Sequence, residues 1–177
     1  MKKSVLAILD SQLRTETVVS ELQQRGIPSS AISVLLPDKQ GTRDFAHEHN
    51  TKAPEGAVAG AGTGGVIGGT LGVLAGIGAL AIPGAGPFIA AGPLMAALSG
   101  AAAGAAIGGI AGALIGLGIP EMEAKRYEGK VRGGNILIAI HVEDSDQQKA
   151  AEEVLKRESA RDISTTTESS VPRDARA

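Results

Sequence analysis

A stretch of 63 residues, from Ala57 to Ile119, contains no Asp, Glu, Lys, Arg or His. Nineteen of the chain's 25 glycines lie within it. Residues four apart share one face of an α-helix, so glycine at every fourth position predicts a helix with a smooth stripe against which another helix can pack closely. Two such runs occur, and we expect their glycines to mediate helix packing and self-association: Gly60, Gly64, Gly68, Gly72, Gly76 and Gly100, Gly104, Gly108, Gly112, Gly116.

A short segment rich in proline and glycine separates the two runs. Residues 82–87 read Ile-Pro-Gly-Ala-Gly-Pro. Proline lacks a backbone N–H and its ring clashes with the preceding turn, so neither proline can continue a helix. We therefore predict a helical hairpin over residues 57–119, with helices over 57–82 and 88–118. Its turn residues are expected to be Pro83, Gly84, Gly86 and Pro87.

The absence of charge favours a hairpin that spans a membrane. At about 1.5 Å per residue, each helix is long enough to cross a hydrocarbon core of about 30 Å. A helix in water normally needs a polar face, which these helices lack. Large apolar side chains are sparse, however, aromatic residues make up only 2 % of the chain, and the flanking segments carry charges of both signs, all of which weaken the membrane prediction.

Two alternatives remain open. The first is a soluble assembly, a filament or shell, in which the hairpins of many copies form the core. The second is a pore, which is disfavoured because only Thr63, Thr70 and Ser99 could supply a polar lining. A single copy would expose too much apolar surface in every case, so we expect a homo-oligomer.

The parts of the chain on either side of the hairpin have the same pattern. Residues 1–38 predict a strand, a helix and a strand, and residues 135–165 predict the same order again. The expected elements are strands at Val5–Leu9, Ile32–Leu36, Ile136–Ile140 and 162–164, a helix over 12–25, and a helix over 146–158 capped by Ser145. Residues 39–56 are expected to be a linker, 120–134 a short charged helix and a turn, and 166–177 a disordered tail.

Two strand–helix–strand units most simply share one four-stranded antiparallel sheet. The two apolar strands would lie in its centre and both helices on one face. We therefore predict an α+β protein, a split ferredoxin-like (βαβ–βαβ) domain into which the Gly/Ala-rich helical hairpin is inserted.

No pattern in the sequence indicates catalysis or a cofactor. The chain has no cysteine and a net charge of −2 with scattered basic residues, which argues against thiol chemistry and against nucleic acid as a partner. The segment Gly60–Gly65 matches G-x-G-x-x-G but lacks the preceding strand and the later acidic residue of a dinucleotide site. His47 and His49 are expected to lie in a solvated loop instead of a metal site. We predict no catalytic, cofactor-binding or metal-binding residue.

Several segments resemble a bacterial family of general stress or heat-induced stress proteins with a glycine-zipper middle region. The matching segments are 5–11, 32–35, the Gly/Ala-rich middle with residues 82–87, 116–121, Tyr127 and 133–137. The resemblance implies a stress-associated protein without known catalytic residues.

These patterns together predict a non-enzymatic, self-assembling stress protein that is associated with membrane lipid through its hairpin. A hairpin returns the chain to the side on which it started, and we read no export signal, so both termini are expected in the cytoplasm. A soluble cytoplasmic assembly is the alternative.

Overall fold

The computed structural model describes five parts of the chain, residues 3–37, 74, 78–82, 86–94 and 104–167. Its strands are β1 (Lys3–Leu9), β2 (Ile32–Pro37), β3 (Gly78–Ile82), β4 (Gly86–Ala91), β5 (Ile136–Val142) and β6 (Arg161–Thr167). Its helices are α1 (Gln12–Gln24), the 3₁₀ turn η1 (Ser29–Ala31), α5 (Gly104–Gly116), α6 (Glu121–Arg132) and α7 (Ser145–Arg157).

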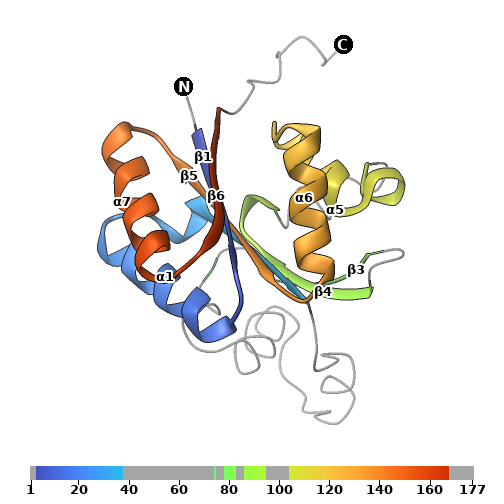
Figure 1. Cartoon of the computed structure of the whole chain (residues 1–177), viewed down its shortest axis with the longest axis horizontal. Coiled ribbons are helices and arrows are strands. Elements are labelled where there is room, and N and C mark those ends of the chain that lie inside the picture. Colours follow the sequence, from blue (N-terminus) through green and yellow to red (C-terminus); the bar gives the residue numbers. More distant parts are fainter. Residues whose placement is uncertain (1–2, 38–73, 75–77, 83–85, 95–103, 168–177) are drawn as a thin grey trace, which may run out of the picture.

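The strands form one six-stranded sheet in the order β3-β4-β2-β5-β1-β6, and every neighbouring pair is antiparallel. Helices α1 and α7 cover one face, and α5 and α6 cover the other (Figure 1). The protein is therefore an α+β fold with three layers. The short charged helix predicted over 120–134 is confirmed as α6, but the prediction placed no helix on the second face, so the packing of α5 and α6 there was not predicted.

The first part of the chain folds as a strand, a helix and a strand, as predicted. Ser11 caps α1, because its hydroxyl accepts a hydrogen bond from the Arg14 backbone N–H at 3.3 Å. The helix is followed by Gly26, whose φ of 84° is left-handed. The Ile27 N–H then bonds to the Leu22 carbonyl at 3.0 Å, which closes the last turn and directs the chain back to the sheet.

The last part of the chain has the predicted order of elements, with two corrections. Asp144, not Ser145, caps α7, and its carboxylate accepts hydrogen bonds from the Asp146 and Gln147 N–H groups at 2.9 and 2.7 Å. A carboxylate also interacts favourably with the positive end of the helix dipole. Strand β6 continues to Thr167, two residues into the predicted disordered tail, because it pairs with β1 along its length.

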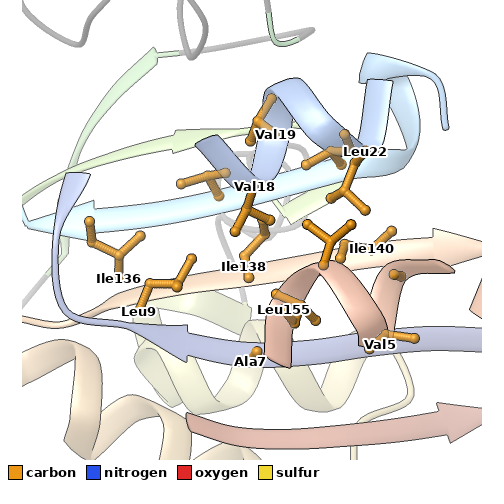
Figure 2. Close-up of a cluster of buried hydrophobic side chains, with 14 of the residues drawn as sticks. Val5, Ala7, Leu9, Val18, Val19, Leu22, Ile136, Ile138, Ile140 and Leu155 are labelled. Atoms are coloured by element: carbon orange, nitrogen blue, oxygen red, sulfur yellow. The ribbon is translucent and has the colours of Figure 1, made fainter. Parts of the chain in front are cut away.

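Alternate residues of the central strands divide between two apolar clusters. Val5, Ala7 and Leu9 of β1 pack with α1 and α7 in the first cluster (Figure 2). Leu6 and Ile8 lie on the opposite face, in the second cluster with α5 and α6. A strand buried on both faces reads as a continuous apolar run, which is why β1 and β5 could be predicted as central strands.

The middle region differs from the predicted helical hairpin. Residues 78–82 and 86–91 form the antiparallel pair β3 and β4. The chain reverses where a turn was predicted, between Ile82 and Gly86, but it joins strands there, not helices. Pro87 and Pro93 leave only five residues between them, too few for a stable helix, while a short apolar run suits an inner strand.

Helix α5 is the described remainder of the predicted hairpin. It has 13 residues, a length of about 20 Å, and Gly109 interrupts it with φ 57° and ψ −144°. The predicted helices over 57–82 and 88–118 are therefore wrong at residues 78–82 and 88–91, which lie in strands, whereas residues 104–116 are helical as predicted. Within the described ranges, no helix combines the length and the apolarity that crossing a membrane requires.

Gly92 allows the end of β4 to approach β2. Its φ is +74°, and a Cβ built at this position would overlap the backbone carbonyl of Ile32. Two residues later, the Leu94 N–H donates to the Ser33 hydroxyl at 3.1 Å, and Ser33 is fully buried. Backbone packing therefore holds this part of the apolar region against β2.

We predict that Gly92→Ala destabilises the protein by about 3 kcal/mol or more, because it combines a left-handed backbone with a clash against another strand. Gly116→Ala is the matched control, since a Cβ there meets open space, and it should be neutral or stabilising by up to about 1 kcal/mol. Urea unfolding monitored by circular dichroism measures both. Equal stabilities for the two variants would contradict the placement of Gly92.

Candidate functional site

The structure describes six of the fourteen residues predicted to mediate packing and turning. Gly104, Gly108, Gly112 and Gly116 belong to α5, and Gly86 and Pro87 belong to β4. The other eight lie outside the described residues, namely Gly60, Gly64, Gly68, Gly72, Gly76, Gly100, Pro83 and Gly84. The packing of one glycine run against the other therefore stays a prediction.

The glycine repeat of α5 does not form one continuous stripe. Gly109 breaks the helical geometry between Gly108 and Gly112. A Cβ on Gly109 would lie 3.1 Å from Glu128 Oε1 of α6, so this glycine makes a close approach although it lies outside the four-residue repeat. Repeat spacing could not reveal Gly109, because its importance depends on where α6 packs.

The two outer strands of the sheet are the places where its backbone could bind another strand. In the described part of the chain, β6 pairs only with β1, and β3 pairs only with β4. The outer side of an edge strand presents backbone N–H and C=O groups that can bind a further strand, and natural proteins block such edges with charges, bulges and short strands. The two edges differ in these features.

The β6 edge contains a β-bulge at Asp162. Leu6 of β1 pairs with Ser164 and Ile8 pairs with Arg161, so two residues of β6 lie opposite the single residue Ala7. Asp162 has a φ of 50°, a left-handed conformation that is uncommon for a residue with a side chain. The bulge bends the strand and interrupts the regular row of backbone groups along this edge.

Tyr127 of α6 holds this bulge from the second face of the sheet. Its side chain is fully buried, and its hydroxyl donates to the Asp162 carbonyl at 2.7 Å. The Ser164 hydroxyl oxygen lies 2.9 Å from the Tyr127 hydroxyl oxygen and 3.1 Å from Glu123 Oε2. The two hydroxyl groups carry one proton each, so together they can donate only two hydrogen bonds at one time.

The environment of Tyr127 also suppresses its ionisation. Burial raises the pKa of the phenol, and the carboxylates of Glu123 and Asp162 raise it further, while the hydrogen bond with Ser164 and the charge of Arg126 lower it. The net effect is a pKa above the ordinary value, because a phenolate in this apolar setting would lose its hydration. The group is therefore suited to packing and hydrogen bonding at neutral pH.

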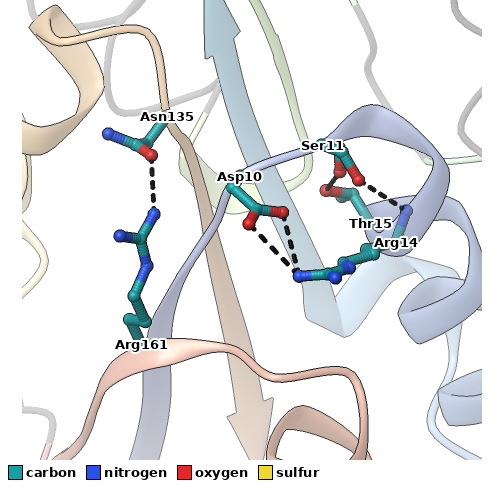
Figure 3. Close-up of polar contacts among 6 residues, drawn as sticks. All are labelled: Asp10, Ser11, Arg14, Thr15, Asn135 and Arg161. Atoms are coloured by element: carbon teal, nitrogen blue, oxygen red, sulfur yellow. Dashed lines mark hydrogen bonds and ion pairs between the residues drawn. The ribbon is translucent and has the colours of Figure 1, made fainter.

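Charged side chains surround the same edge. Lys130 Nζ lies 3.5 Å from Asp162 Oδ2. At the end of the sheet where β6 begins, Arg161 donates to Asn135 Oδ1 at 3.0 Å, and the Arg14–Asp10 ion pair lies at 3.2 Å (Figure 3). Exposed ion pairs contribute little to stability, but charge on an edge strand opposes pairing with another strand.

The β3 edge has none of the charges found on β6. Residues 78–82 read Gly-Ala-Leu-Ala-Ile, within the 63-residue stretch that contains no charged side chain. Its pairing with β4 is regular from Gly78 opposite Ala90 to Ile82 opposite Gly86, with no register shift. A regular, uncharged edge strand is the combination that favours pairing with another chain.

A serine and a histidine meet across the central strands. Ser4 Oγ and His141 Nδ1 are 3.0 Å apart, the contact that a nucleophile and its general base would make. Ser4 is only 4 % exposed and lies within a regular central strand, so a substrate could not reach its hydroxyl. We assign the pair to packing. The antiparallel register of β1 and β5 brings these residues together, and the sequence analysis missed the pair.

Among the described residues, no three His, Asp or Glu side chains converge in a way that could hold a metal ion. His47, His49 and the segment Gly60–Gly65 lie outside the described residues.

Comparison of the chain with protein-family models, with curated proteins and with solved structures finds no match.

We predict that Tyr127→Phe lowers the free energy of unfolding by about 1–3 kcal/mol at neutral pH, because the Asp162 carbonyl loses its buried donor. Wild-type stability should also fall as the pH rises past about 10, since the phenol ionises in the unfolded chain before it does so in the native protein. The phenylalanine variant should lack this alkaline contribution, so the difference in stability between the two proteins should shrink at high pH.

The ionisation itself can be followed directly, because Tyr127 is the only tyrosine and the chain has no tryptophan. Phenolate absorbance should appear at higher pH in the native protein than in urea. Identical titration curves in the two conditions would contradict the buried position of Tyr127.

Proposed function

We propose that this protein is a non-enzymatic structural protein that assembles with copies of itself through its apolar middle region. The observation that carries the proposal is that this region supplies the uncharged outer strand β3 to a sheet whose other edge is bulged and charged. An edge of that kind is a site for strand pairing between chains. The conclusion favours a soluble assembly over a membrane hairpin.

Burial of the middle region in the protein's own core supports this preference. Phe88, Ala90 and Leu94 belong to the second apolar cluster, together with Ile110 and Leu114 of α5. The same cluster includes residues of β1, β5 and α6. The charged halves are the two parts of the chain on either side of the apolar middle region, and they supply β1 and β5. Apolar side chains that β1 and β5 already shield from water do not require a lipid environment.

Two finer points belong to the same proposal. The four strands from the two terminal parts of the chain have the order β2-β5-β1-β6 with α1 and α7 on one face, and we infer that they represent a ferredoxin-like unit, to which β3, β4, α5 and α6 are added. The resemblance to bacterial stress proteins supports a role under stress, in which assembly would serve a structural purpose.

Purification without detergent, followed by size-exclusion chromatography with light scattering, tests the proposal. The expected result is a particle whose mass is a multiple of the 17.8 kDa chain. A 17.8 kDa monomer at all concentrations would contradict self-assembly. Retention in carbonate-washed membranes of native cells would instead favour the membrane-inserted alternative.

A further inference from the structure

We propose that β3 pairs in antiparallel orientation with β3 of a second copy, so that the two six-stranded sheets join into one sheet of twelve strands. The inference rests on the proposed self-assembly and names the surface that carries it. Its chemistry is the pairing of backbone N–H and C=O groups along two identical edges, the isologous contact of a two-fold dimer.

The identity of the partner follows from charge. A strand without charged residues can lie beside an identical strand without placing like charges opposite each other. A partner that binds through charged side chains would find no complementary group within residues 78–82. A second copy of the same edge is therefore the occupant that the sequence of β3 suits.

The register follows from the length of β3. Two antiparallel strands of five residues pair completely in only one register, which places the two-fold axis at the middle residue. That residue is Leu80, so Leu80 would lie opposite Leu80 of the second copy, and Ala79 opposite Ala81. Every other register leaves residues at the strand ends without a partner.

The β6 edge limits the sheet to two copies. Its bulge at Asp162 and the charges of Arg161 and Lys130 oppose further strand addition. Pairing through β3 alone therefore produces a closed dimer, and a filament or shell would require a second contact surface. The dimer is the smallest assembly unit that the inference predicts.

Disulfide cross-linking tests both the partner and the register, because the natural chain has no cysteine. In the proposed register, the two copies of residue 80 have Cα atoms about 4.5–5.5 Å apart, within the range that a disulfide can bridge. The two copies of residue 79, or of residue 81, are separated by two residues along the strand and lie about 8 Å apart, beyond that range.

Leu80→Cys should therefore form a covalent dimer on mild oxidation, whereas Ala79→Cys and Ala81→Cys alone should not. A mixture of Ala79→Cys and Ala81→Cys proteins should form the mixed dimer, and this arm leaves Leu80 in place should its replacement impair folding. Thr167→Cys on the β6 edge is the matched control, since Thr167 is exposed, and it should remain monomeric on a denaturing gel.

The outcomes separate this inference from the proposed function. Absence of cross-links in all β3 variants, with wild-type particles still larger than 17.8 kDa, would overturn the β3 contact and leave self-assembly intact. A wild-type monomer without cross-links would overturn both and would point to an edge covered by the chain itself. Equal cross-linking at positions 79, 80, 81 and 167 would show random collision and would also overturn the contact.

Discussion

The arrangement of the apolar middle region depends on the pairing of β4 with β2. Residues Val34–Pro37 lie opposite Phe88–Ala91, and this contact is possible because Gly92 has no side chain to meet the Ile32 carbonyl. The pairing brings an uncharged segment, separated from β2 by a long stretch of sequence, into the same sheet as the charged halves. It also pairs the outer edge of β2, which a four-stranded sheet would leave unpaired.

Helix α6 contacts both the apolar middle region and the β6 edge of the sheet. It packs on the second apolar cluster with α5, and its Tyr127 hydroxyl binds the bulged strand β6. The outer strands of the sheet are consequently of opposite character: β6 is bent and surrounded by charge, while β3 is regular and uncharged. This asymmetry would make the proposed contact between copies through β3 specific.

Sequence patterns predicted the charged halves well, because their elements are determined locally. The apolar run of β1, the cap at Ser11 and the glycine that follows α1 each act within a few residues. The middle region was predicted less well, since four-residue glycine spacing is compatible with a helix but does not require one. The prolines around residues 88–92 make a short strand the better interpretation, yet its partner β2 is identified only by the tertiary structure.

The contact site proposed on β3 could not be predicted from neighbouring residues in the sequence. Residues 78–82 were predicted to be helical, so no edge strand was expected in this region. The Asp162 bulge and its contacts with Tyr127 and Lys130 likewise depend on how α6 crosses the sheet. What the sequence did indicate is that this uncharged stretch would mediate self-association, which remains a prediction.

The pairing of β4 with β2 can be tested most directly by measuring contacts between backbone protons of residues 86–91 by nuclear magnetic resonance. This pairing predicts cross-strand contacts that match the register of Leu35 opposite Ala90 and Leu36 opposite Ile89, together with slow amide exchange in β4. Contacts between residues three and four apart within 86–91, without any contact to β2, would indicate a helix and would contradict the role of the middle region in the sheet.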